Sequence, residues 1–278
     1  LISTITAAVV ADFISKQFFG LNPVFNFSTS QAIPLNNYWI LLILGICLGI
    51  FGAFYNWITL KTQDLYAKLK CSTSIKLMIP FLLAGILGLL FPIVLCGGHA
   101  IVEELSLTTT LSLLLLMLVA KFLFSIISFG SGAPGGIFFP LLIIGGTFGA
   151  VFGYIAINYL GISPTLFNNF IIISMAGYFT AIVRAPITGI ILITEMTGSF
   201  THLLSLSVVS IISYIVADLL KSTPIYDSLL KRLLLKNNIN EYHSKSTKKI
   251  IITNVVHFGS KIEKTYLNNL KLPENTLI

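Results

Sequence analysis

Long runs of apolar residues constrain this chain more than any other feature. The runs at 77–95, 111–120, 137–160 and 203–216 approach or exceed the roughly 20 residues that a helix needs to cross a bilayer. Only 10% of the 278 residues are charged, and the mean hydropathy is +0.93. Soluble domains carry about 25% charged residues. The sequence therefore predicts an all-α polytopic membrane protein.

The net charge of +7 is concentrated in two regions. One is a stretch that we expect to be a short polar loop, and the other follows the last apolar run. Because cytoplasmic segments carry an excess of Lys and Arg, both regions are expected to face the cytoplasm. A multi-pass plasma-membrane protein with a cytoplasmic C-terminal tail follows, and a nucleic-acid partner is not needed. The residues are Lys61, Lys68, Lys70 and Lys76 in the first region, and Lys221, Lys231, Arg232, Lys236, Lys245, Lys248 and Lys249 in the second.

A stretch rich in glycine and proline at 128–140 separates two apolar runs, 111–127 and 141–159. Non-helical backbone at membrane depth is tolerated only where it is buried in protein or lines a wet cavity. We expect four residues to set the geometry of this loop, because glycine permits turns and close approach while proline fixes φ. The alternative is a simple hinge between two helices. The four are Gly132, Pro134, Gly135 and Pro140.

The backbone N–H groups of Gly136, Ile137 and Phe138 lie at the start of the helix that follows this loop. The first N–H groups of a helix have no partner within it, and the helix dipole places positive charge there. An anion is the ligand that such a helix start favours. The sequence therefore predicts an anion site built from amides, without a cationic side chain.

Further apolar segments complete a helical outline. Helices are expected at 1–20, 38–60, 167–180 and 202–220, with a loop at 21–37 and a short polar turn at 100–110. The segment at 187–195 is apolar but too short to span, which predicts a re-entrant half-helix. An amphipathic helix at 224–235 is expected to end the membrane part. Broken segments of this kind are typical of transporters whose sites form at discontinuous helices.

Charged residues inside apolar runs are candidates for function, and here they are Lys121, Arg184 and Glu195. Each could instead be a structural partner. Neither Cys nor His residues have metal-ligand spacing, and no nucleophile or phosphate-binding motif occurs. We therefore expect no enzyme, no catalytic residues, no metal and no cofactor.

Three motifs resemble the CLC family of chloride channels and chloride/proton antiporters. They are Gly-Ala-Pro-Gly-Gly-Ile-Phe-Phe-Pro at 132–140, Arg-Ala-Pro-Ile-Thr-Gly-Ile-Ile-Leu-Ile-Thr-Glu-Met-Thr at 184–197, and Pro-Ile-Tyr at 224–226. The resemblance covers roughly residues 34–235. It implies that the amides of Ile137 and Phe138 bind chloride and that Tyr226 donates its hydroxyl. It also implies a homodimer with one pore per subunit, which carries chloride and, as an antiporter, protons.

The chain resembles only the second of the two inverted repeats of this fold, with its broken and re-entrant helices, plus the end of the first. The family's loops with a pore-lining serine and a gating glutamate do not occur. Alone, this chain is therefore not expected to transport. Leu21 stands where many bacterial antiporters have an inner proton-relay glutamate, which weakens proton coupling by that route. The choice between channel and antiporter stays open.

Residues 1–235 are thus assigned to the membrane domain, and 236–249 to a polar cytoplasmic linker. Residues 250–256 are β-branched and favour a strand, and 250–278 resemble the start of a TrkA-C (RCK C-terminal) domain. This predicts a partial α/β cytoplasmic domain with a small regulatory ligand. Two alternatives remain: a cation transporter subunit with an RCK-type tail, and a non-transporting fragment of a split membrane protein.

Overall fold

The computed structural model describes residues 2–20, 24–25, 27 and 31–236, and their regular structure is entirely helical. The chain divides into two compact units, Leu1–Lys231 and Arg232–Ile278. The strand expected at 250–256, the TrkA-C-like segment at 250–278 and Leu21 lie outside the described residues. The helices are α1 Ile2–Phe19, α2 Tyr38–Lys68, α3 Thr73–Leu90, α4 His99–Glu104, α5 Leu111–Gly130, α6 Phe138–Leu160, α7 Phe167–Val183, α8 Pro186–Thr197, α9 Leu203–Leu219 and α10 Ile225–Lys236.

Helix α2 is longer than the sequence predicted. It continues past residue 60 to Lys68, so Lys61 and Lys68 lie on the helix rather than in a loop. Packing explains the extension: the buried Tyr66 and the side chain of Thr62 lie against Gly130 at the end of α5, where a Cβ would be only 2.5 Å from Thr62. The extra turns of α2 therefore bury side chains against α5.

Two other boundaries also differ from prediction. The expected polar turn at 100–110 contains helix α4, because Ile101 and Val102 are apolar enough to bury a face against α6. The apolar run at 77–95 is not one helix. Helix α3 starts earlier and stops at Leu90, and Phe91 leaves the helical region because Pro92 disfavours that conformation in the residue before it.

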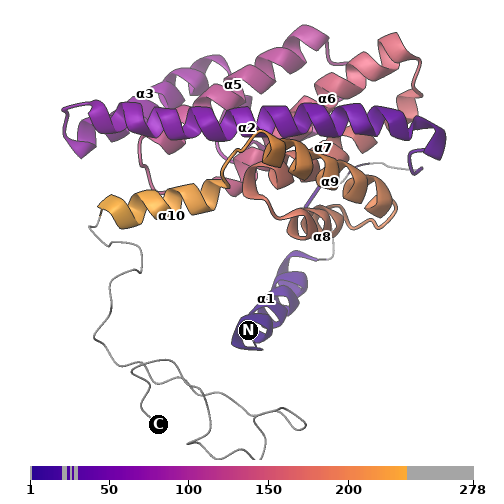
Figure 1. The fold of residues 1–278 in the computed structure, drawn as a ribbon, viewed down its shortest axis with the longest axis horizontal. Coiled ribbons are helices and arrows are strands. Elements are labelled where there is room, and N and C mark those ends of the chain that lie inside the picture. The colour runs from indigo at the N-terminus through magenta and orange to yellow at the C-terminus, as the bar shows by residue number, and fades with distance from the viewer. Residues whose placement is uncertain (1, 21–23, 26, 28–30, 237–278) are drawn as a thin grey trace, which may run out of the picture. The chain divides into compact units, whose positions relative to one another are not determined.

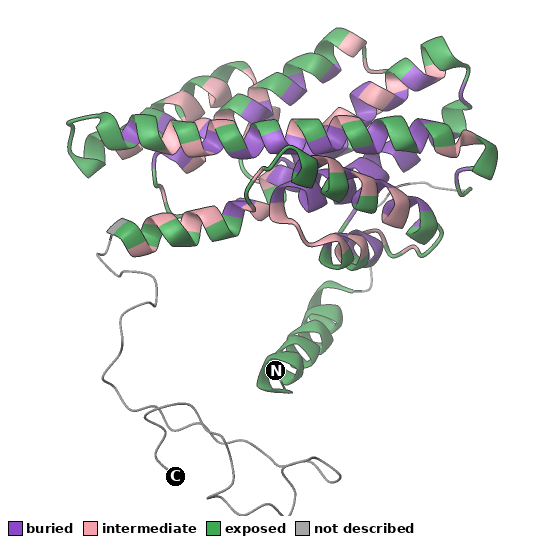
Figure 2. Cartoon of the chain, in the orientation of Figure 1, coloured by how far each residue is buried: buried purple, intermediate pink, exposed green. Residues whose placement is uncertain are grey.

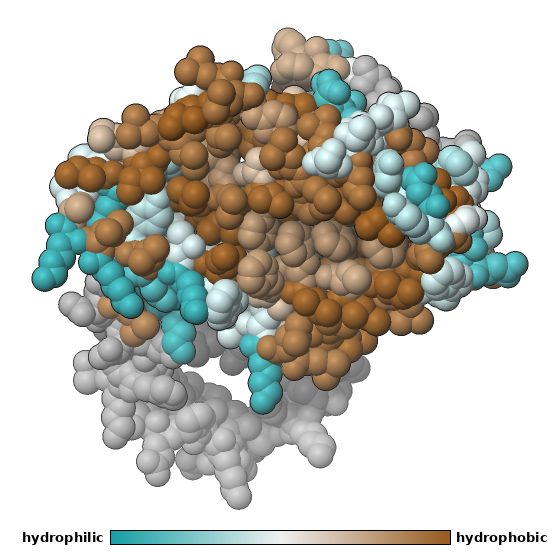
Figure 3. Space-filling view, turned by 90° about the horizontal axis from the view of Figure 1, so that it is seen from above, coloured by the Kyte–Doolittle hydropathy of each residue, from teal (hydrophilic) through white to brown (hydrophobic). Residues whose placement is uncertain are grey.

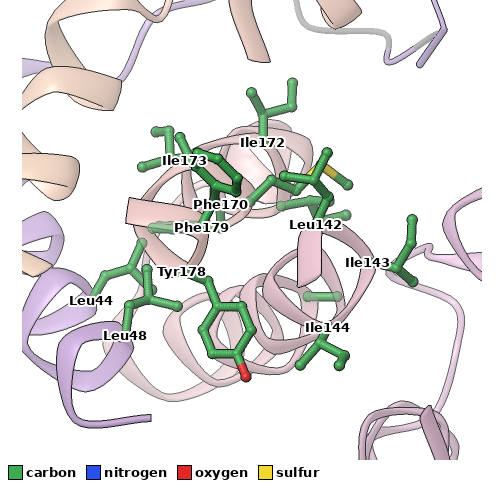
Figure 4. Close-up of a cluster of buried hydrophobic side chains, with 14 of the residues drawn as sticks. Leu44, Leu48, Leu142, Ile143, Ile144, Phe170, Ile172, Ile173, Tyr178 and Phe179 are labelled. Carbon is green, nitrogen blue, oxygen red and sulfur yellow. The ribbon is translucent and has the colours of Figure 1, made fainter. Parts of the chain in front are cut away.

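The core lies between α2, α6, α7 and α9, and α7 is buried along almost its whole length. In Figure 1 the long helix α2 lies along α7 and α9, which it contacts. Figure 4 shows side chains from three helices meeting: Leu48 from α2, Leu142 from α6, and Phe170 and Tyr178 from α7. These apolar side chains fix the centre of the bundle.

Glycines allow the helices to approach closely and reveal their directions. A Cβ on Gly45 would lie 2.8 Å from Ile212, and one on Gly49 would lie 2.6 Å from Val216, so α2 and α9 run parallel. A Cβ on Gly149 would lie 2.4 Å from the carbonyl oxygen of Phe170. Small residues at such contacts are typical of membrane helices. The parallel pair brings the C-terminal ends of α2 and α9 to the same side.

The surface of the described helices suits a bilayer. Six helical segments of the described chain are long and apolar enough to cross a membrane: α1, α3, α5, α6, and α2 and α7 each together with the short turn before it, as Leu35–Lys68 and Pro164–Val183. The segments Pro186–Thr197 and Leu203–Leu219 are apolar but shorter than these six. Helix α1 has no buried residue, and its residues are exposed throughout in Figure 2. Figure 3 shows a broad apolar face with hydrophilic side chains at its margins. These features indicate a multi-pass membrane protein.

Candidate anion-binding site

The loop between α5 and α6 is held by its own hydrogen bonds. The Ser131 hydroxyl donates to the carbonyl oxygen of Ser128 at 2.7 Å, and the backbone N–H of Ala133 donates to the Ser131 hydroxyl at 3.2 Å. Gly132 has φ +80°, a left-handed conformation that side chains with a Cβ rarely adopt. The chain thereby turns away from α5 without a longer connection.

Helix α6 begins at Phe138, with Ile137 as its N-cap, and the first helical bond runs from Leu141 N–H to the Ile137 carbonyl at 3.2 Å. Within the described residues, the amides of Gly135, Gly136, Ile137 and Phe138 donate no hydrogen bond. The missing N–H of a proline costs little in the first turn of a helix, where Pro140 lies. The loop thus presents free donors at a helix start.

A cavity of about 260 Å³ opens beside these donors. The loop lines it with Pro134, Gly135, Gly136, Ile137 and Pro140, and α5 lines it with residues of one helix face. A Cβ built on Gly135 or Gly136 would meet no atom within 4 Å. An ion can therefore reach the backbone of these glycines without a side chain in the way.

Lys121 also lines this cavity, from the middle of α5. The expectation of an anion site without a cationic side chain stays a prediction. Lys121 is 1% exposed, and its Nζ donates to the carbonyl oxygens of Val94 and Cys96, each at 2.8 Å. The sequence placed it sixteen residues before Ile137 on another helix, so its proximity was not predictable from spacing. The sequence feature that could have indicated a role for Lys121 is that it is the one lysine in the apolar run at 111–127.

Phe138 and Tyr226 are not brought into this cavity. The ring of Phe138 packs edge-on against Phe139 and Phe179, with 5.7 Å between centroids in each case. The side chain of Tyr226, on α10, is 46% exposed and is not among the lining residues. Burial of part of the ring raises the pKa of the Tyr226 hydroxyl above its ordinary value of 10.0, so the group stays a donor at neutral pH.

Arg184 makes contacts that join elements of the fold. Its guanidinium donates to the carbonyl oxygens of Tyr214 at 3.0 Å and Ser222 at 2.8 Å, and it pairs with Asp218 at 3.3 Å. From α2, the buried Asn56 donates to the carbonyl oxygens of Ile182 and Thr223, each at 3.1 Å. Both side chains tie the end of α7 to the segment that leads into α10.

Glu195, the other charged candidate, is exposed at the end of α8. Where the structure describes the chain, no group of three or more His, Cys, Asp or Glu residues could hold a metal ion. Nε2 of His99 lies 3.7 Å from Oε1 of Glu103, one turn later on α4, and the His99 ring stacks on the ring of Phe25. The chemistry of the cavity is therefore that of backbone amides, hydroxyls and one ammonium group.

The sequence profile described as "Voltage gated chloride channel" matches residues 1–218. The chain belongs to the voltage-gated chloride channel family. The resemblance to the CLC family drawn from the three motifs is thereby confirmed over these residues. The match stops before the segment that resembles a TrkA-C domain.

Two relatives are named H(+)/Cl(-) exchange transporter ClcA. The protein of Vibrio parahaemolyticus serotype O3:K6 is 33% identical over 247 residues, and that of Vibrio cholerae serotype O1 is 35% identical over 252 residues. Each match covers 86% of this chain and 52% of the relative. The chain thus spans about half the length of the curated relatives it matches.

Solved structures share the fold. A slow cyanobacterial Cl-/H+ antiporter is similar with a TM-score of 0.72 and 30% identity, over 83% of this chain and 55% of that one. A CLC-type fluoride/proton antiporter, 18% identical, has a TM-score of 0.61 over 77% of this chain and 51% of that chain, and supports the fold alone. The prediction of a CLC-type helical membrane fold is therefore confirmed.

Proposed function

We propose that this chain forms the C-terminal half of a membrane protein that transports chloride, as a channel or as a chloride/proton antiporter. The observation that supports this most directly is the start of α6, where the amides of Gly136, Ile137 and Phe138 donate no hydrogen bond and Gly136 and Ile137 line a cavity. A transported anion loses much of its hydration shell on the way. Backbone N–H groups replace it, and because they are neutral dipoles the ion can leave again.

Tyr226 is proposed to add a hydroxyl to the anion site from the start of α10. The raised pKa of its hydroxyl keeps it a donor at neutral pH. The contacts of Arg184 and Asn56 join the segment before α10 to α2 and to the end of α7. The position of Tyr226 thus depends on these two polar side chains.

The proposed organisation is a membrane domain at 1–235, a linker at 236–249 and the start of a regulatory TrkA-C-like domain at 250–278. The protein works in the plasma membrane as a homodimer with a cytoplasmic tail, and a small ligand binds that tail domain. Chloride is the ligand carried, without a cofactor, and the activity is transport rather than catalysis. Leu21, in place of an acid, disfavours proton coupling through that position.

A cation transporter fits the loop less well. Cation sites need carbonyl or carboxylate oxygens, whereas the free groups at the start of α6 are N–H donors. Two carbonyl oxygens near the cavity, those of Val94 and Cys96, already accept hydrogen bonds from Lys121. The local charge is positive, which repels a cation.

Liposomes that contain the full-length protein test this proposal. Chloride efflux and proton uptake are recorded together after a chloride gradient is imposed. Chloride movement that drives protons uphill identifies an antiporter, and chloride movement without protons identifies a channel. Absence of chloride movement from liposomes with correctly inserted protein would reject chloride transport.

A further inference from the structure

We propose that the cavity between α5 and the loop at 131–137 is an anion subsite in which Lys121 supplies the positive charge and Ser128 a neutral donor. This inference rests on the proposed function and adds side-chain determinants to its backbone site. The ligand is a small monovalent anion, because the cavity presents a single cationic group. The residues that carry it are Lys121, Ser128, Gly135, Gly136 and Ile137.

Lys121 is a buried cation without an anionic partner. Burial of an ammonium group in a low-dielectric region is costly unless an opposite charge compensates it. Within the described residues, none of the ion pairs involves Lys121, and its two partners are neutral carbonyls. A Lys ammonium has three N–H donors. Two of these N–H groups donate to the carbonyl oxygens of Val94 and Cys96. The third N–H group and the positive charge of the ammonium remain available to an anion in the cavity.

The backbone around Lys121 is shaped to hold the ammonium in place. Gly98, with φ +91°, lies so close that a Cβ there would be 2.9 Å from Cε and 3.0 Å from Nζ of Lys121. Any side chain at this position would displace the ammonium. The absence of a side chain at Gly98 thus leaves room for the ammonium.

Ser128 provides an independent sign of a ligand. Its hydroxyl oxygen is buried, has no hydrogen-bond partner in the described part of the chain, and belongs to a residue that lines the cavity. A buried hydroxyl without a partner is destabilising. Ser125 lines the same cavity, but its hydroxyl lies 2.9 Å from the hydroxyl of Tyr55 and is satisfied. The unpartnered group is therefore Ser128, one turn nearer the loop.

The loop completes the donor set. The free amides of Gly135, Gly136 and Ile137 belong to loop residues that line the same cavity. A cavity of about 260 Å³ exceeds the ~30 Å³ share of one water molecule several times. A halide in it therefore keeps part of its water shell while it contacts the ammonium, the Ser128 hydroxyl and the amides.

Chloride binding to the full-length protein, measured by calorimetry in detergent, tests the charge of Lys121. Lys121→Gln removes the charge but keeps an NH₂ donor for the carbonyls of Val94 and Cys96, and Lys121→Met removes both. Both variants are expected to weaken chloride binding at least about tenfold, because hydrogen bonds to charged groups are worth more than neutral ones. Lys70→Met, which removes an exposed lysine after α2, is the matched control and is expected to bind normally.

Several results would overturn this subsite. One is normal binding in Lys121→Gln with weakened binding only in Lys121→Met, since the lysine would then serve to hold the two carbonyls. Normal chloride binding in both Lys121 variants would also overturn the subsite, but it would not contradict the proposed function. No chloride binding by the unmodified protein would instead remove the proposed function itself, and the subsite with it.

Crystals of the unmodified full-length protein soaked in bromide give a test that does not depend on the folding of variants. Anomalous density is expected in the cavity, within contact of Lys121 and Ser128. Bromide density elsewhere in the protein, with none in the cavity, would overturn the subsite. In solution, Ser128→Ala is expected to weaken binding by roughly threefold to tenfold, as loss of one hydrogen bond does, and Ser125→Ala by less.

Discussion

At the scale of single residues, the site combines bare backbone with a few polar side chains. Gly135 and Gly136 leave open space where a Cβ would stand, and Ile137 is buried as the N-cap of α6. The donors are thus fixed by the helix, while the approach stays clear. Rigid donors cost little reorganisation when an ion arrives.

Tyr226→Phe tests the proposed hydroxyl donor. Loss of one hydrogen bond to a charged ligand costs about 1.5 kcal/mol or more, which corresponds to roughly tenfold weaker chloride binding. Since burial raises the pKa of this hydroxyl, the wild-type contribution is expected to stay constant as pH rises from about 5 to 9 and to fall only above 10. Calorimetry at several pH values measures both effects.

Tyr159→Phe is the control for this comparison, because Tyr159 is 74% exposed at the end of α6. It is expected to bind chloride like the unmodified protein. Equal affinity in Tyr226→Phe and Tyr159→Phe would remove Tyr226 from the anion site.

The sequence was sufficient to predict the loop but not the cavity wall. Gly132, with its left-handed φ, and Pro140, in the first turn of α6, lie where a break between two helices requires them. Lys121 could not be placed, because the contact between α5 and the loop depends on how far α5 extends. The helix was expected to stop at 127 and continues to Gly130.

At the scale of elements, polar contacts join α2, the end of α7 and the connection before α10. Asn56 on α2 donates to the carbonyl oxygens of Ile182 and Thr223, and Arg184 donates to that of Ser222. The carbonyl oxygens at helix ends have no partners in their own helix, so these side chains satisfy them. The connection into α10 is thereby anchored to α2 and α7.

Asn56→Leu is expected to weaken this anchor. The substitution keeps the side-chain volume similar but leaves two carbonyl oxygens without a donor at a site where Asn56 is 1% exposed. The expected loss of stability is about 2 kcal/mol, seen as a lower thermal midpoint in detergent. Chloride affinity should fall as well, because Tyr226 lies directly after the anchored segment.

Asn158→Leu is the matched control. Asn158 donates only to the carbonyl oxygen of Tyr154, within its own helix, and is exposed. Little change in the thermal midpoint is expected. A midpoint for Asn56→Leu as high as that of Asn158→Leu would show that the anchor contributes nothing to stability.

Helix boundaries were the least predictable part of the elements. Hydropathy placed the centres of the spans correctly, because lipid-facing and buried positions are both apolar. It could not place the ends of α2 or α4, which depend on tertiary contacts of Tyr66 with α5 and of Ile101 with α6. The helix propensity of the local sequence alone does not reveal these tertiary contacts.

At the scale of the whole molecule, the parallel course of α2 and α9 makes the orientation in the membrane testable. Their C-terminal ends carry Lys61, Lys68 and Lys221 on the same side, which the excess of positive charge assigns to the cytoplasm.

Helix α7 also runs parallel to α2. A Cβ on Gly52 would lie 2.6 Å from Ala181, and one on Gly177 would lie 2.8 Å from Leu48. The connection after α6, which leads into the start of α7, is therefore expected on the opposite side.

Cys71, exposed between α2 and α3, reports this orientation. With every other cysteine of the full-length protein replaced, a membrane-impermeant maleimide is expected to label Cys71 in inside-out vesicles and not in intact cells. Ser163→Cys, placed in the connection after α6 in a Cys71→Ser background, should show the reverse pattern. Labelling of Cys71 from outside intact cells would invert the proposed topology.

The family and general architecture followed from three short motifs, since these lie where helices break and where backbone conformation is most restricted. The organisation of residues 236–278 stays a prediction. The chain spans about half the length of the curated relatives it matches.

The most direct measurement compares chloride flux through the full-length protein with Gly136→Leu and with Gly85→Leu in liposomes. Both glycines have open space around them and negative φ, but Gly136 lies at the cavity whereas Gly85 lies on the exposed face of α3. Gly136→Leu is expected to abolish flux because its side chain fills the approach to the free amides. Gly85→Leu should leave flux unchanged. Normal flux in correctly folded Gly136→Leu would contradict the assignment of this loop as the anion site.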